Sequence, residues 1–309
     1  MPKALGAFDA PDQSESSPSA APQPGYRLLD HDEKIVSVED LSAYLADFVR
    51  HDPRNHLPEG DDLPIFDEPV VGVAAADDPL FARLPLPEVV GPIHATPDFW
   101  LPGAKTVVSF FAPFSQEIKN TYRGNSSKLP TLEWVSARLN GEIFLNVLRR
   151  ALWRFLTKQG AQAVIPNLDR RYRAENYLAM WSERHVAYVA GVGAFGLHCG
   201  LLTAKGAAGR IGSVVADLAL PPTRRPYSGV YDYCLLKRGF ECGACIKKCP
   251  AGALSKDGKD HQACSRNGDE LIRPAYRGWG YHSCGHCQNN LPCSDGIPAK
   301  LAGTRPLAS

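Results

Sequence analysis

The sequence of 309 residues lacks the features that mark several large classes of protein. It has no apolar run near the roughly 20 residues that a membrane-spanning helix needs. Its 34 lysines and arginines nearly balance its 33 aspartates and glutamates, so no excess of positive charge points to nucleic acid. We therefore expect neither a membrane protein nor a strongly basic nucleic-acid-binding protein.

The N-terminal segment also lacks the marks of an export signal. Residues 1–25 contain no basic stretch followed by an apolar one, and no pair of adjacent arginines. They are rich in proline, serine, alanine and glutamine without a hydrophobic period, which predicts a disordered tail. We expect a cytoplasmic protein, where thiols stay reduced and clustered cysteines more often bind metal than form disulfides.

Cysteine is absent from the first 198 residues, and eight of the nine cysteines lie between residues 234 and 293. Cys199 stands apart from them, and a lone cysteine is more often a small buried apolar residue than a nucleophile. Eight clustered thiols are enough ligands for two four-cysteine sites. The sequence therefore predicts two metal centres in the last quarter of the chain.

The spacing of these cysteines favours [4Fe–4S] clusters over zinc. Cys242, Cys245 and Cys249, followed by proline, match the last three positions of the two-cluster run C-x2-C-x2-C-x3-C-P, whose fourth cysteine ligates the other cluster. The first position of that run is Gly239 here, so Cys234 is the nearest thiol that can replace it. Paired C-x2-C elements also occur in zinc ribbons, and two zinc sites remain the alternative.

The same crossover rule divides the eight cysteines into two sets of ligands. The first cysteine set is Cys234, Cys242, Cys245 and the distant Cys293. The second cysteine set is Cys249, Cys264, Cys284 and Cys287.

The residues before the cysteines predict mixed strands and helices. Short apolar runs, each bounded by proline, glycine or aspartate, are typical of buried strands. They cover residues 70–74, 106–111, 161–165 and 211–220. Apolar residues at three- and four-residue steps predict a helix from Thr131 to about Lys158 and another from Glu175 to about Ala190. An N-cap at Ser37 predicts a further short helix.

These elements predict an α/β (α+β) body over residues 26–224, which would hold the cofactor or substrate. A small cysteine-rich module, the double [4Fe–4S] cluster domain, follows over residues 225–309. Its basic residues, among them Lys247 and Lys248, are either a docking face for an acidic electron donor or simply a solvated surface.

Several stretches together resemble the epoxyqueuosine reductase family and its short iron–sulfur relatives, and more distantly the reductive dehalogenases. These stretches are residues 101–108, 181–196 and 212–217 and the run that begins at Cys242. The resemblance implies a nitroreductase-like body joined to a ferredoxin-like domain with two [4Fe–4S] clusters. It also implies cobalamin between the two parts, with the clusters passing single electrons to cobalt.

The resemblance assigns cofactor-binding candidates within the stretch 181–196. Gly191, Gly193 and Gly196 match the family's glycine turn near the corrin, where glycine lets a flat macrocycle approach the backbone. Their alternative is a turn that merely ends a helix. Arg184 and His185 lie in the matched helix, where they would reach a cofactor phosphate or amide, or else serve as surface or core residues.

Two departures from the family leave the substrate open. Tyr177 stands where epoxyqueuosine reductases place an acidic proton donor, and reductive dehalogenases use a tyrosine acid. Its alternative is an aromatic residue on a buried helix face. The chain also lacks the C-terminal helical repeats with which full-length family members hold tRNA. We therefore expect an unknown small-molecule or nucleoside substrate, and not tRNA.

One function and two alternatives follow. The first is a cytoplasmic iron–sulfur oxidoreductase related to epoxyqueuosine reductase. It would take electrons from a donor such as ferredoxin or flavodoxin and pass them from two [4Fe–4S] clusters to cobalamin or to the substrate. The second is a non-catalytic ferredoxin-type electron carrier or partner protein without corrin. The third is a structural protein held together by zinc.

Overall fold

A four-stranded antiparallel sheet lies at the centre of the protein, in the order β1–β2–β8–β3. We analysed a computed structural model that describes residues 37–58, 62–279 and 283–301, so the tail predicted for residues 1–25 lies outside it. The strands are β1 Val70–Ala75, β2 Thr106–Pro113, β3 Ala163–Val164 and β8 Gly209–Ala216. They confirm the four predicted strands. β8 ends earlier than predicted because its partner β2 begins at Thr106, opposite Ala216.

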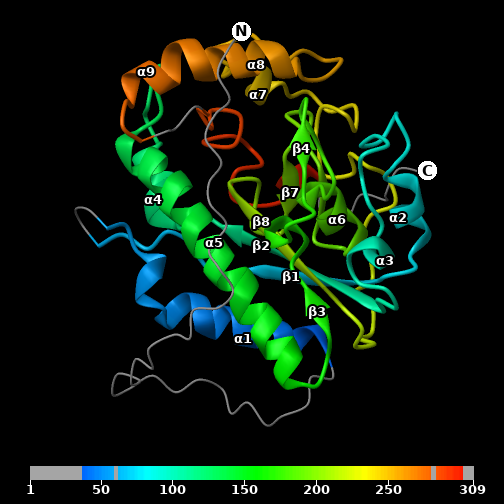
Figure 1. Cartoon of the computed structure of the whole chain (residues 1–309). Coiled ribbons are helices and arrows are strands. Elements are labelled where there is room, and N and C mark those ends of the chain that lie inside the picture. The colour runs from blue at the N-terminus through cyan, green and yellow to red at the C-terminus, as the bar shows by residue number, and fades with distance from the viewer. Residues whose placement is uncertain (1–36, 59–61, 280–282, 302–309) are drawn as a thin grey trace, which may run out of the picture.

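Helices cover both faces of this sheet (Figure 1). β2 is buried along its whole length, with Val108 and Phe110 on one face and Val107 and Phe111 on the other. The helices α1 Val38–His51 and α5 Leu132–Lys158 pack on the first face. The short helices α2 Pro79–Arg83, α3 Pro97–Trp100 and α6 Glu183–Val189 pack on the second. The fold is therefore a mixed α/β arrangement with small sheets.

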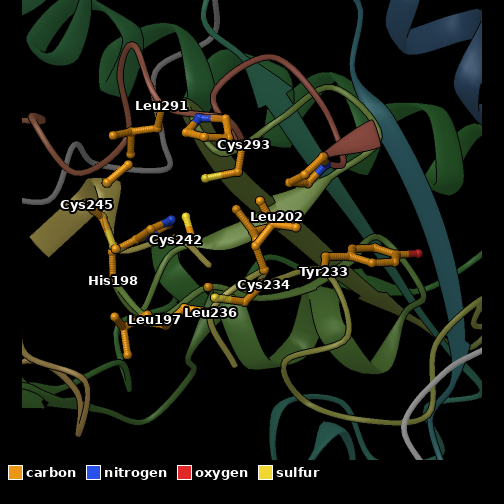
Figure 2. Close-up of a pocket in the computed structure, with 16 residues that line it drawn as sticks. Leu197, His198, Leu202, Tyr233, Cys234, Leu236, Cys242, Cys245, Leu291 and Cys293 are labelled. Carbon is orange, nitrogen blue, oxygen red and sulfur yellow. The ribbon is translucent and has the colours of Figure 1, made fainter. Parts of the chain in front are cut away.

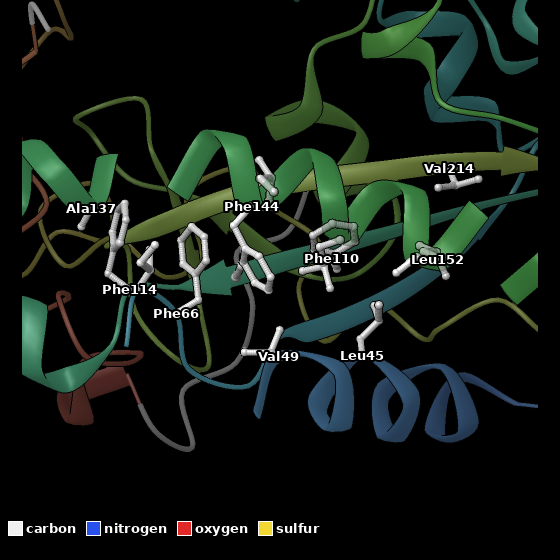
Figure 3. Close-up of a cluster of buried hydrophobic side chains, with 14 of the residues drawn as sticks. Leu45, Val49, Phe66, Phe110, Phe114, Ala137, Phe144, Leu152 and Val214 are labelled. Atoms are coloured by element: carbon white, nitrogen blue, oxygen red, sulfur yellow. The ribbon is translucent and has the colours of Figure 1, made fainter. Parts of the chain in front are cut away.

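The helices α1 and α5 begin where the sequence predicts. α1 starts with a capping box, in which the Ser37 side chain accepts the Asp40 N–H and the Asp40 side chain accepts the Ser37 N–H. α5 starts after Thr131, whose side chain accepts the Trp134 N–H. Figure 3 shows side chains of both helices, such as Leu45 of α1 and Leu152 of α5, on the same side of the sheet as Phe110 of β2. This apolar layer fixes the position of α5, and one end of α5 supports the cysteine-rich part.

The helix predicted from Glu175 to Ala190 is wrong in its first half. A short hairpin of β4 Ala174–Glu175 and β5 Leu178–Ala179 stands there, and α6 begins only at Glu183. Asn176 and Tyr177 form the turn of the hairpin with φ of 47° and 65°. Two adjacent residues in the left-handed region end any right-handed helix, and asparagine tolerates that region well.

The chain after β8 consists of loops and short helices. α7 Ala244–Lys247, α8 His261–Asn267 and α9 Arg273–Ala275 gather at one end of the molecule (Figure 1). The remaining elements are α4 Gln116–Thr121, β6 Gly193–Phe195, β7 Leu201–Thr203, a π-helical turn at Gly268–Ile272, and 3-10 turns at Pro53–Asn55, Pro166–Leu168 and Ala299–Leu301. None of the helices in the described part is long and apolar enough to cross a bilayer.

Candidate metal centre

All four cysteines of the first set line one cavity. The empty space between the lining residues is ≈ 380 Å³, including its opening to solvent. Figure 2 shows the four labelled cysteines around this space, with His198 beside Cys242 and Cys245. The remaining lining is mostly apolar, with leucines such as Leu202 and Leu291. The cavity therefore offers sulfur ligands within an otherwise apolar wall.

Distant parts of the chain bring the first set together. Cys242 and Cys245 flank the start of α7, whereas Cys234 precedes it and packs against Leu202 of β7. The Ala207 N–H donates to the Cys293 carbonyl over 3.0 Å, which fixes the far C-terminal segment against the β7–β8 loop. The body thus contributes to closing the cavity, which the cysteine-rich segment does not form alone.

Burial dominates the electrostatics of these thiols. It raises the pKa of Cys245 to about 11, and the neighbouring Cys234 and Cys242 thiols add to the effect. It likewise raises the pKa of Cys293 to about 12, again with help from the other three thiols. Four thiolates so close together and so poorly hydrated repel one another. Burial therefore favours the protonated form of Cys245 and Cys293, and metal binding must release their protons.

The second cysteine set shows the same mutual influence. Burial raises the pKa of Cys287 to about 12 and raises that of Cys284, and in both cases the Cys264 and Cys249 thiols add to it. Cys249 follows α7, Cys264 lies within α8, and the other two lie in the loop beyond α9. The Cys249 sulfur also accepts the Ala253 N–H over 3.3 Å. A sulfur that accepts a backbone N–H is better able to carry the negative charge of a metal-bound thiolate.

All nine cysteines lie in the described part of the chain, and each is a free thiol. Among the residues that the structure describes, no three or more His, Cys, Asp or Glu side chains converge closely enough to hold a single metal ion. A [4Fe–4S] cube binds its ligands at four separate corners, so it holds thiolate sulfurs further apart than one ion does.

The body holds the Cys284–Cys287 segment in place. The Tyr122 hydroxyl donates to the Cys284 carbonyl over 2.6 Å and lies 3.2 Å from His286 Nδ1. Gly285, with φ of 76°, lies so close to the Trp134 indole that a β-carbon would be 2.4 Å from Nε1. Only glycine suits both the backbone conformation and this contact. The start of α5 thus packs against this cysteine pair.

The glycines matched to the corrin turn approach the chain itself. A β-carbon would lie 3.3 Å from Thr223 at Gly191, 2.3 Å from the Leu202 carbonyl oxygen at Gly193, and 2.7 Å from His198 Nε2 at Gly196. Neighbouring protein atoms therefore occupy the space in which a side chain would lie at each of these three positions. These three glycines allow close packing of β6, β7 and their loops.

Arg184 and His185 lie at the start of α6, partly buried. Arg184 Nη1 donates to the Cys199 carbonyl, and burial lowers the pKa of the guanidinium. His185 Nδ1 lies 2.7 Å from Ser182 Oγ, and burial lowers the pKa of His185 to about 3, with the Arg184 charge adding to it. His185 is therefore neutral at pH 7. Cys199 has φ of 61°, and its place is held by the Arg184 contact.

Tyr177 lies at the exposed tip of the β4–β5 hairpin. The residue is 63% exposed, and its ring centroid lies 5.8 Å from that of His261 in α8. The hairpin of the body and a helix of the cysteine-rich part thus meet at these two rings. Tyr177 is accordingly not an aromatic residue on a buried helix face.

Two functional candidates escaped the sequence analysis. Glu183 lies inside the body, where Ser213 Oγ donates to its carboxylate over 2.7 Å and burial raises its pKa to about 7. His198 is 4% exposed and lines the cavity of the first cysteine set. Nothing in the local sequence places Ser213 beside Glu183. The position of His198 next to Cys199 was the only hint in the sequence.

No family model matches this sequence, and no curated protein does. Several solved structures resemble it. The chain is similar in structure to epoxyqueuosine reductases. It is 19% identical to the enzyme from Bacillus subtilis, with a TM-score of 0.49 over 86% of this chain and 68% of that one. For the Streptococcus thermophilus enzyme the values are 14%, 0.44, 88% and 67%.

Reductive dehalogenases match as well. A catabolic reductive dehalogenase is 14% identical, with a TM-score of 0.49 over 74% of this chain and 30% of that one. Another, whose structure suggests a mechanism for B12-dependent dehalogenation, has a TM-score of 0.46 over 70% of this chain and 28% of that one. The chain therefore spans under a third of these proteins.

Proposed function

We propose that this protein is an iron–sulfur oxidoreductase related to the epoxyqueuosine reductases. The first cysteine set would hold one [4Fe–4S] cluster and the second set the other. When bound, such clusters supply transfer of single electrons. In this proposal residues 26–224 form a nitroreductase-like body and residues 225–309 a ferredoxin-like cluster domain.

The single observation that carries the proposal is the cavity of the first cysteine set. Four thiols from separate segments line it, and the crossover rule grouped the same four from spacing alone. Cys249 lies only four residues after Cys245, yet the thiols that raise the pKa of Cys284 and Cys287 include Cys249 and none of the first set. This division supports two four-thiol sites over one mixed site.

The chain's own residues would control access to the clusters. Apolar residues around the first cavity exclude water, and the Tyr122 hydroxyl orients the Cys284–Cys287 pair. Electrons would enter from a donor such as ferredoxin or flavodoxin, docking near basic residues that include Lys247 and Lys248. At the contact between the β4–β5 hairpin and α8, Tyr177 would give a proton to the substrate. That substrate is an unidentified small molecule or nucleoside.

The packing at the matched glycine turn does not fit cobalamin. The glycines that would cradle its corrin pack against Thr223, Leu202 and His198, and Arg184 is bonded to the Cys199 carbonyl. This packing favours a second candidate function, an electron carrier of the ferredoxin type without corrin. Cobalamin titration of the cluster-loaded protein separates the two candidates. Base-off binding at micromolar concentration supports the cobalamin-dependent reductase, and its absence supports the carrier.

Iron loading of cysteine variants tests the two-cluster proposal. The protein should be reconstituted without oxygen, and its iron, sulfide and zinc measured alongside the EPR spectrum after dithionite reduction. We expect Cys293→Ser and Cys242→Ser to remove one EPR signal, and Cys249→Ser and Cys287→Ser to remove the other. Cys199→Ser is the matched control, because Cys199 belongs to neither set, and it should keep the iron content of the parent protein.

Two results would overturn the proposal. One is stoichiometric zinc without iron after anaerobic purification. The other is loss of the same EPR signal in Cys249→Ser and Cys242→Ser, which would place these two cysteines in one site.

A further inference from the structure

We propose that His198 donates a hydrogen bond from Nε2 to a sulfur atom of the cluster held by the first cysteine set, and so raises the reduction potential of that cluster alone. This inference rests on the proposed function, because it needs a cluster in the first cavity. It assigns a tuning role to a residue outside both cysteine sets.

The position of the His198 proton follows from one contact. The Gly200 N–H donates to His198 Nδ1 over 3.0 Å, so Nδ1 acts as the acceptor. A neutral imidazole has one acceptor nitrogen and one N–H, and its proton therefore lies on Nε2. An imidazolium has two N–H groups and no acceptor nitrogen, so the same contact requires the neutral ring.

The Nε2–H group has no acceptor among the residues that the structure describes. His198 is 4% exposed, and Nε2 is a buried side-chain atom without a hydrogen-bond partner among the described residues. A buried donor without an acceptor is unfavourable, and such groups in native proteins usually face a ligand or an ordered water. The ring lines the cavity together with the four thiols of the first set (Figure 2). The cluster that fills this cavity would supply the missing acceptor.

The same tautomer excludes His198 as a metal ligand. Coordination through Nε2 needs a lone pair there, which would move the proton to Nδ1, opposite the Gly200 N–H. Two donors would then face each other. His198 is accordingly a positioning residue that acts on the cluster through hydrogen bonding.

The expected effect is a shift in one potential. Reduction adds negative charge to the cluster, and a hydrogen-bond donor stabilises the more negative state. His198→Leu should therefore lower one midpoint. A tenfold change in the equilibrium of one-electron reduction corresponds to about 59 mV, which is the size of shift we expect. The second cluster should keep its midpoint.

The experiment is a redox titration of the anaerobically loaded protein, followed by EPR. His198→Gln retains an N–H donor of similar reach and should restore part of the shift. His94→Leu is the matched control, because His94 is also a buried histidine, 3% exposed, but stacks on Trp181 in the body. Both midpoints should stay unchanged in that variant. Unchanged midpoints in fully loaded His198→Leu, or equal shifts in His94→Leu, would overturn the inference.

A measurement on the parent protein covers the case in which His198→Leu fails to fold. Histidine labelled with ¹⁵N should show a nitrogen hyperfine coupling to the reduced first cluster in pulsed EPR, and Cys242→Ser should abolish it. If the iron-loaded protein shows no such coupling, the proposed role of His198 is wrong, but the two-cluster proposal is not contradicted. A protein that takes up no iron contradicts the proposed function itself.

Discussion

Glu183 brings a carboxyl group into the interior between α6 and β8. Ser213 Oγ donates to Oε2, and the Trp181 indole N–H donates in turn to Ser213 Oγ over 2.8 Å. The Arg149 guanidinium lies 3.5 Å from Oε1 and favours the charged form. Burial outweighs it, and the pKa of Glu183 rises to about 7. Near neutral pH this residue therefore exchanges a proton inside the body.

This shift predicts a pH dependence of stability. The unfolded carboxyl, with a pKa of 4.5, loses its proton before the folded one does at about 7. Between these values the folded state binds more protons, so the contribution of Glu183 to stability is full below pH 4.5 and falls as pH rises through 7. Glu183→Gln should remove a fall of about 3 kcal/mol between these limits.

Urea unfolding of the parent protein and of Glu183→Gln at several pH values between 5 and 8 measures this effect. The difference between the two unfolding free energies should change with pH in favour of the variant at high pH. Glu88→Gln, at an exposed loop position, controls for the loss of one charge. A difference that stays constant over this range would contradict the shift.

The β4–β5 hairpin shows how a local sequence can mislead at the scale of one element. Residues 175–190 contain enough apolar residues to suggest one helix, but Asn176 and Tyr177 turn the chain back and Met180 N–H donates to the Arg173 carbonyl over 3.0 Å. The strand pairing and the contact with His261 hold the turn. Strained residues of this kind often stand at functional sites, because surrounding structure must hold them.

The left-handed φ of Tyr177 predicts an order of stability among variants. Tyr177→Gly should be at least as stable as the parent, because glycine adopts this conformation without strain. Tyr177→Val should be less stable by about 1–2 kcal/mol, since a β-branched residue is especially unfavourable there. Denaturant unfolding checks the order. Equal stability of Tyr177→Val and the parent would show that the turn relaxes. Tyr177→Phe removes only the hydroxyl. It should keep the stability of the parent, so a loss of activity in this variant would reflect the proton donor and not the turn.

At the scale of the whole molecule, the cysteine-rich part depends on the body for its shape. Lys119 pairs with Asp295 over 3.0 Å, and Tyr122 reaches Cys284 across a sequence separation of 162 residues. The segments that carry the C-terminal cysteines thus contact the end of α4 and the residue that follows it. Cluster binding and folding of the body should be coupled in consequence.

Tyr122→Phe tests this coupling. It removes the hydroxyl that donates to the Cys284 carbonyl oxygen. The free energy of unfolding should therefore fall by about 1–3 kcal/mol. The second cluster should also be lost faster, as measured by iron release to a chelator. Tyr44→Phe is the matched control, because its hydroxyl also donates to a distant backbone carbonyl, that of Ala151, far from the cysteines. Iron release at the parent rate in Tyr122→Phe would contradict the coupling.

Much of the secondary structure can be predicted from the local pattern of residues in the sequence. The caps at Ser37 and Thr131 and the apolar runs of β1, β2, β3 and β8 depend on neighbours within a few residues, so the sequence predicts them well. The hairpin at Asn176 and Tyr177 was missed because the apolar periodicity there is shared by a helix and by a chain folded onto a core. Antiparallel pairing of all four strands likewise depends on contacts between distant segments.

Sequence by itself determined the number, type and spacing of the thiols, because ligand chemistry is a property of individual residues and short turns. Only the tertiary structure decided what surrounds them. It brought Cys293 to the cavity of Cys242 and filled the space beside Gly193 with the Leu202 backbone. It also buried the His198 Nε2–H where no described residue accepts from it. Burial and hydrogen bonding between segments far apart in the chain arise only when the whole molecule folds.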